Sequence, residues 1–128
     1  MCGSRGTAPL LPKHLVFSFK YYDCTNPNFG PSHAKDGYLK SLLERFRDLC
    51  QLPLAEFMQY HKAVRSHSIV FAETSEPDGF AHIRNTALWE NTARQFEVSK
   101  SQHGRVHGFM IDPVFFVVWI DPDHKLYS

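Results

Sequence analysis

An unbroken apolar run near the end of the chain, VFFVVWI at residues 114–120, constrains the fold more than any other feature of the sequence. A short continuous run of β-branched and aromatic residues is typical of a strand that is buried on both faces. Arg105–Ile111 predicts the preceding strand, and Asp112-Pro113 predicts the bend between the two. We therefore expect an antiparallel sheet in this part of the chain, with the strand at 114–120 at its centre.

The strand before the bend is predicted to carry basic residues on one face, at its start, and apolar residues on the other. Because side chains alternate along a strand, Arg105, His107 and Phe109 share one face, and Val106 lies on the other. Gly108 interrupts this alternation with a residue that has no side chain. A glycine inside a strand indicates a β-bulge or a close approach of another backbone segment.

Two helices are predicted between a first strand and the C-terminal sheet. The sequence LVFSFKYY at Leu15–Tyr22 alternates as a strand does, Ser32 can cap a helix that runs to about Leu49, and Pro53 suits the first turn of a second helix. The apolar positions of the first helix recur at helical spacing and are expected to form one stripe: Tyr38, Leu39, Leu42, Leu43, Phe46 and Leu49.

Length and composition indicate a single domain. The chain has 128 residues, of which 43% are hydrophobic, enough to bury one core. Residues 1–12 are rich in Gly, Pro and small residues and predict a flexible N-terminal arm. Residues 13–128 are expected to form one α+β domain, in which a mostly antiparallel sheet of about four strands is covered on one face by a two-helix hairpin.

The segment between the second helix and the C-terminal sheet is harder to assign. SIVFA at 68–72 predicts a short strand, and the following ETSEPDG breaks regular structure. Leu88 and Trp89 are expected to reach the core from a loop or from a single helical turn.

Charge and cysteine content argue against several functional classes. The 14 basic residues nearly balance the 13 acidic ones, which disfavours a strong non-specific grip on nucleic acid. The three cysteines are widely spaced, so we expect reduced thiols and neither a disulfide framework nor a zinc ribbon. No stretch approaches the roughly 20 apolar residues of a membrane span, and we expect a cytoplasmic protein without a membrane partner.

Motifs for metal, nucleophilic or phosphate-loop chemistry are not recognisable. The histidine pair His103 and His107 falls on a turn and a strand, with no known ligand spacing. The sequence contains no G-x-S-x-G elbow, and GSRG near the start follows no predicted strand. We expect no metal and no cofactor.

Acid–base residues gather around the apolar run. Cleavage of RNA through its own 2′-hydroxyl needs a base, an acid and a cation near the phosphate. His107 and His124 have the chemistry of the first two, Arg105 and Lys125 that of the cation, and Tyr127 can stack on a base or donate a proton. The alternative is that these residues form a solvated sheet edge and a packed C-terminal tail.

Basic residues of the helical part, among them Lys62 and Arg65, are further candidates for contact with phosphates. Such charges more often solvate a helix face. If they instead contact duplex DNA, an accessory DNA-binding role is a third possible function.

The order of a strand, two helices, an antiparallel run and the ending DPDHKLYS resembles the RelE/ParE superfamily of small bacterial toxins. The ending is similar to that of the YafQ-type branch, although one residue separates His124 from Leu126 where that branch has two. The C-terminal part of the chain also resembles a set of uncharacterised bacterial proteins, through the patterns GRxHGF and VVWxDPDHKLY. The likeness covers residues 96–127 and, more loosely, 15–65, and leaves residues 66–95 unexplained.

The resemblance implies a RelE-like fold and a metal-independent endoribonuclease, or mRNA interferase. It places His124 and Tyr127 in the catalytic site with Arg105 facing the scissile phosphate, and matches His107 by type and neighbourhood. It implies RNA, on or off the ribosome, and a small antitoxin protein as partners. The alternative is a non-catalytic module on the same fold that binds a protein or a nucleic acid, which the near-neutral charge favours.

Overall fold

The computed structural model describes residues 14–30, 35–58, 66–98 and 104–127. Its elements follow the order β1 (Val16–Ser18), α1 (Tyr38–Cys50), α2 (Leu54–Met58), β2 (His67–Ser68), the 3-10 turns η3 (Phe71–Glu73) and η4 (Thr86–Leu88), β3 (Ala93–Glu97), β4 (Arg105–Ile111) and β5 (Val114–Asp121). The chain is therefore an α+β protein, as the sequence predicts. The predicted N-terminal arm, residues 1–12, lies outside the described residues.

The five strands form one mixed sheet in the order β1-β5-β4-β3-β2. Neighbours are antiparallel except β1, which runs parallel to β5 with Val16 opposite Val114. The sequence predicted about four strands, and the sheet has five. The additional one is β2, a two-residue edge strand at His67–Ser68 that pairs with β3. Strand β5 lies inside the sheet between β1 and β4 rather than at its centre.

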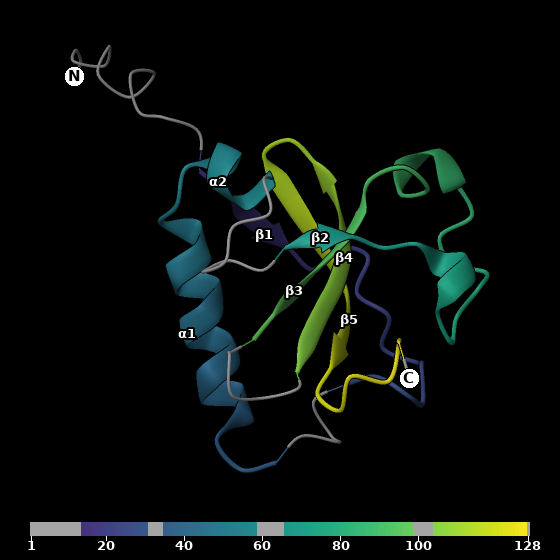
Figure 1. The fold of residues 1–128 in the computed structure, drawn as a ribbon, viewed down its shortest axis with the longest axis horizontal. Helices are drawn as coiled ribbons and strands as arrows, with labels where there is room; N and C mark the ends of the chain where they lie inside the picture. Colours follow the sequence, from purple (N-terminus) through teal and green to yellow (C-terminus); the bar gives the residue numbers. More distant parts are fainter. Residues whose placement is uncertain (1–13, 31–34, 59–65, 99–103, 128) are drawn as a thin grey trace.

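The sheet separates two layers (Figure 1). Helices α1 and α2 lie on one side, and the segments that contain η3 and η4 lie on the other. On the helix side, the two helices and the sheet share one apolar core, which includes Tyr38, Leu42, Leu49, Leu54, Phe57, Phe96, Val106, Met110, Phe115 and Val117. Aromatic edges meet in this core, with the ring centroids of Phe57 and Phe115 at 5.7 Å.

A second apolar core fills the opposite face of the sheet. Strands β3, β4 and β5 contribute side chains to it, and so do the loops before α1, between β2 and β3, and after β5. Its members include Phe29, Ile69, Phe80, Ile83, Trp89, Ala93, Phe109, Val118, Trp119 and Leu126. Trp89 is buried and its indole N–H donates to the Ile83 carbonyl at 3.0 Å. Trp89 was predicted to reach the core from a loop or a single helical turn, and it follows directly after the 3-10 turn η4.

A β-bulge in β5 lets this strand serve both cores. The pairing shifts between His107 and Gly108, so that Trp119 faces His107 while Val117 faces Gly108. Val118 is the extra residue, and both it and Trp119 belong to the second core. Gly108 predicted a bulge or a close backbone approach, and the structure has both: the bulge lies in β5 opposite the glycine, and the Phe116 carbonyl approaches Gly108 closely.

Other predicted boundaries are wrong, for local reasons. The first strand ends at Ser18 rather than Tyr22, because the Tyr22 N–H turns back to the Phe19 carbonyl at 3.1 Å. Helix α1 begins at Tyr38, because Gly37 before it has a φ of 84° and is not helical. The predicted cap Ser32 lies outside the described residues.

The run SIVFA is also not the strand it predicts. Pairing with β3 stops at Ser68, and the chain then turns into η3 at Phe71–Glu73. Within the described residues, no helix is long and apolar enough to cross a membrane.

We expect Gly108→Ala to destabilise the protein by about 3 kcal/mol, at the upper end of the cost of overpacking a core. A Cβ at this position would collide with the Phe116 carbonyl oxygen and would lie 2.6 Å from the Phe115 ring. Urea unfolding followed by circular dichroism measures the effect. Gly37→Ala is the control: it meets no atom within 4 Å and should cost only about 1 kcal/mol for its positive φ. Equal losses in the two variants would contradict the packing argument.

Candidate functional site

The residues singled out by the sequence are organised by a buried pair, His107 on β4 and Asp121 at the end of β5. Both side chains are 0% exposed, and His107 Nε2 lies 3.0 Å from Asp121 Oδ2. The imidazole is enclosed by aromatic rings, with centroids 6.0 Å from Phe29 and 6.3 Å from Trp119. This pair therefore lies inside the second core.

Asp121 also fixes the turn that starts the C-terminal tail. Its carboxylate accepts hydrogen bonds from the backbone N–H groups of Lys125, at 2.8 Å, and Leu126, at 3.0 Å. Burial raises the pKa of Asp121, but the hydrogen bonds from His107 and the two backbone groups outweigh this effect and hold the pKa below its ordinary value. The carboxylate is therefore ionised at neutral pH.

Burial makes His107 a neutral hydrogen-bond donor. Desolvation lowers the pKa of His107, the hydrogen bond to Asp121 opposes this effect, and the charges of His124 and Arg105 add to it. Because the Asp121 carboxylate can only accept, Nε2 carries the imidazole proton. Nδ1 is buried and has no hydrogen-bond partner among the described residues. With 0% exposure, this nitrogen does not reach a substrate in this conformation.

Arg105 is engaged at the rim of the same face. Its guanidinium forms an ion pair with Glu97 Oε1 at 3.1 Å across the β3–β4 ladder, and it donates to the Gly104 carbonyl at 3.1 Å. Only 15% of the side chain is exposed. An arginine held this way has most of its charge compensated inside the protein.

The C-terminal tail is joined to the segment after β2. The Val70 N–H donates to the Tyr127 hydroxyl at 3.2 Å, and the Ser75 hydroxyl donates to the Lys125 carbonyl at 3.0 Å. The Leu126 side chain is buried in the second core. His124 has a φ of 55° in the turn that precedes them and is half-buried.

Tertiary structure thus brings only part of the predicted catalytic set together. His124 and Arg105 are near enough to His107 to affect its pKa. The Tyr127 hydroxyl instead contacts the backbone of Val70. The predicted phosphate-binding residues Lys62 and Arg65 lie outside the described residues.

No described part of the second sheet face forms an open platform beside these residues. Aromatic rings pack against this face instead. The ring centroids of Phe80 and Trp119 are 4.9 Å apart, edge to face, and those of Tyr21 and Phe116 are 5.4 Å apart. The segment from Ile69 to Trp89, part of the stretch that the family resemblance leaves unexplained, covers this face (Figure 1). Among the described residues, no group of three His, Cys, Asp or Glu side chains is placed to hold a metal ion.

The helix side carries an apolar surface that the sequence analysis assigned to the core. Leu39 and Leu43 of α1 are 59% and 58% exposed, although both belong to the predicted buried stripe. Phe46 lies one turn further along the helix, and its ring centroid is 5.9 Å from that of Phe19, which is 52% exposed. We call Phe19, Leu39, Leu43 and Phe46 the α1 apolar surface. The signal was present in the sequence, because the stripe is wider than one packed face of a helix.

Comparisons of the chain with models of protein families, with curated proteins and with solved structures found no match.

We expect the buried histidine to make stability depend on pH. An unfolded histidine takes up a proton near pH 6.5, whereas burial holds the pKa of His107 below its ordinary value. Below about pH 6.5 the unfolded state binds more protons, so the free energy of unfolding falls as the pH falls through this window. His107→Gln can still donate to Asp121 but does not titrate.

The difference in unfolding free energy between the wild type and His107→Gln should therefore shrink as the pH is lowered from 7 to 5. Urea denaturation at several pH values measures it. Asp121, whose pKa is also lowered, loses its contribution only below about pH 4, outside this window. Parallel stability curves between pH 7 and 5 would show that His107 titrates normally.

Proposed function

We propose that this protein is a non-catalytic module that binds a partner protein through the α1 apolar surface. The observation that carries the proposal is the exposure of Leu39 and Leu43, at 59% and 58%, on a helix that buries Tyr38, Leu42 and Leu49 on its other side. Contiguous exposed apolar patches with a polar rim are typical of protein-protein contact sites.

The surroundings of this surface fit a protein partner. Lys40, Glu44, Arg47 and Asp48 lie further round the same helix and are exposed, so the rim carries both signs of charge. A rim of mixed charge suits the polar edge of a protein interface, whose apolar centre excludes water. The net charge of +1 offers little attraction for the polyanionic backbone of a nucleic acid.

The C-terminal cluster supports the same proposal from the other side of the sheet. Asp121 accepts hydrogen bonds from His107 and from the tail, and Arg105 is paired with Glu97. Each of these groups therefore has a structural role that accounts for its presence. In the binding module, this cluster stabilises the sheet while the helix side makes the contact.

A photo-crosslinking residue at position 43 should form a covalent adduct with a protein partner in the native host. The same residue at position 90, exposed next to η4 on the opposite side of the sheet, is the matched control and should give at least about tenfold less of that adduct. Adding Leu39→Glu should abolish the adduct at position 43, because a charge in the centre of an apolar contact is strongly unfavourable.

Gel electrophoresis and mass spectrometry of the adducts measure the outcome. Circular dichroism of Leu39→Glu checks the fold, which the change should leave intact because the side chain is already exposed. Equal crosslinking from positions 90 and 43, or an adduct that Leu39→Glu leaves unchanged, would contradict the proposed surface.

The second candidate is the metal-independent endoribonuclease of the toxin type. It is favoured by one observation, that Arg105 and His124 lie within electrostatic reach of His107 at the end of the sheet. In this proposal His124 acts as acid or base, Arg105 and Lys125 stabilise the phosphate, and Tyr127 positions a base. The reaction would require Arg105 to exchange Glu97 for a phosphate.

If the ribonuclease proposal holds, expression of the wild type should inhibit growth and cleave RNA, and replacing His124 and Arg105 together with Ala should remove both effects. Each general acid or base contributes about 10²–10⁴ in rate, so little cleavage should remain. Primer extension on cellular RNA measures the cuts. Unchanged cleavage in the double variant, or none with the wild type, would dismiss this candidate.

A further inference from the structure

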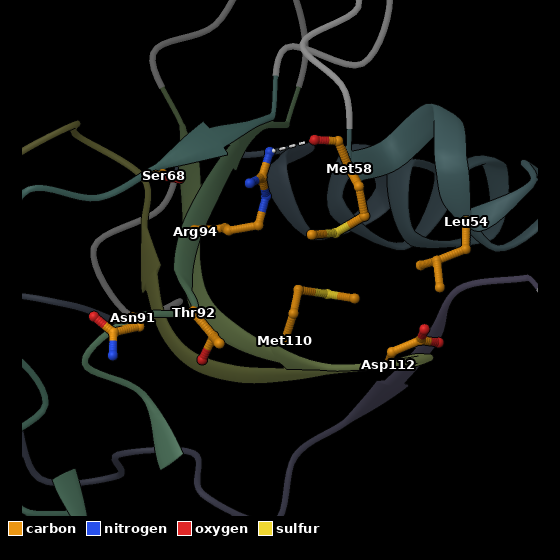
Figure 2. A pocket seen from close by; sticks show the side chains of 8 residues that line it. All are labelled: Leu54, Met58, Ser68, Asn91, Thr92, Arg94, Met110 and Asp112. Carbon is orange, nitrogen blue, oxygen red and sulfur yellow. Dashed lines mark hydrogen bonds between the residues drawn. The ribbon is translucent and has the colours of Figure 1, made fainter. Parts of the chain in front are cut away.

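A pocket of about 200 Å³ opens on the helix side of the sheet, between α2 and strands β2 to β4. Figure 2 shows the Met58 side chain from α2 and the Met110 side chain from β4 extending into its middle, with Leu54 at one end and Arg94 at the other. The short helix α2 leaves this end of the layer incompletely filled. The Asp112 carboxylate lies beside Leu54, and Ser68, Asn91 and Thr92 complete the lining. The pocket therefore has apolar side chains in its middle, a cation toward one end and an acid at the other.

The guanidinium of Arg94 is held rigidly in this pocket. Arg94 lies on β3 and shares its face of the sheet with the buried Phe96. Its Nε donates to the Ser66 hydroxyl at 3.1 Å, and its Nη2 donates to the carbonyls of Met58, at 3.2 Å, and Ser66, at 3.3 Å. Its other amino group, Nη1, makes no hydrogen bond to any described residue. Two N–H donors of a positioned cation are thus available to a ligand.

The charge of Arg94 is not balanced by an acid. Among the described residues, no carboxylate forms an ion pair with it, and burial is the cause that lowers its pKa. A half-buried cation without a counter-charge is unfavourable, because the hydrogen bonds to neutral carbonyls replace only part of its hydration. An anion beside Nη1 would relieve this cost and form a charge-assisted hydrogen bond.

The apolar middle of the pocket suits an aliphatic chain, and the Asp112 carboxylate at the far end keeps the negative end of a ligand beside Arg94. Leu54, Met58 and Met110 supply apolar contact, and methionine side chains adapt to chains of different shape. The volume of about 200 Å³ corresponds to about seven groups of the size of a water molecule. That is the size of a carboxylate with a short hydrocarbon chain, and it is below the size of pockets for drug-sized ligands.

We propose that this pocket binds an aliphatic carboxylate of roughly four to eight carbons. The carboxylate accepts hydrogen bonds from Arg94 Nη1, and the chain lies between Met58 and Met110 with its end toward Leu54. The same chemistry is offered by a free short-chain acid and by the C-terminal leucine or similar residue of a peptide. The site is separate from the α1 apolar surface and does not depend on it.

Titration with hexanoate tests the proposal. Amide chemical shifts in ¹H–¹⁵N spectra of the full chain should change around residues 54–58, 92–94 and 110, with a Kd on the order of 1 mM for so small a ligand. Hexanol has the same chain without the charge and should bind at least about tenfold more weakly, because it forms no charge-assisted bond. Two peptides ending in leucine, one with a free carboxylate and one amidated, form the second arm.

Two variants separate ligand binding from folding. Arg94→Gln should weaken hexanoate binding at least about tenfold, but it also removes bonds that join Ser66 and Met58. Met58→Trp leaves those bonds in place, because Arg94 contacts the Met58 backbone carbonyl, and it should abolish binding by filling the pocket. Val70→Trp places the same bulk at an exposed position outside the pocket and should bind as the wild type does.

Binding of hexanoate, with loss in Arg94→Gln and Met58→Trp, would support the site and identify a free acid as a sufficient ligand. Binding of only the peptide with the free carboxylate would support the same site with a peptide C-terminus as its source. The proposal is overturned if neither ligand shifts these amides at 20 times the expected Kd, about 20 mM. It is equally overturned if hexanol or the amidated peptide binds as well as its charged counterpart, or if Met58→Trp binds normally.

Discussion

Strand β5 is buried on both of its faces, and both layers of the protein depend on it. Phe115 and Val117 point into the core shared with the helices, while Val118 and Trp119 enter the core on the other side. A regular strand would alternate strictly between them; the bulge opposite Gly108 lets two successive side chains face the second core. Because Phe115 and residues 117–120 are buried, each of these apolar side chains must be matched by apolar groups from elsewhere in the chain.

The polar groups at the end of β5 follow from the same constraint. Asp121 is the first polar residue after the apolar run, and it is enclosed together with His107. A buried carboxylate must be paired and hydrogen-bonded, and it accepts from His107 and from the turn at Lys125 and Leu126. The tail then packs on the segment 66–92 and closes the second face. This closure gives residues proposed for catalysis a structural role.

The chemistry of the candidate sites was only partly predictable. Alternation correctly places Arg105 and His107 on one face of β4, and the pairing of that strand follows from the bend at Asp112-Pro113. Whether those side chains are enclosed depends on Phe29 and on the tail, which are distant in sequence and carry no local pattern that points to them. Arg94 escaped notice for a related reason: the strand was expected to begin at Phe96, so the alternation that puts an arginine on an apolar face was not visible.

By itself, the sequence determined the α+β class, the two long strands, the bulge at Gly108 and the helical phase of α1, because strand alternation and helical periodicity are local properties of the chain. It did not determine the parallel pairing of β1, the cover over the second face, or which part of the α1 stripe stays exposed. Those depend on contacts between distant segments. Helical phase says that Leu39 and Leu43 lie beside Leu42, but only the packing of α1 against the sheet decides that Leu42 is buried and the other two are not.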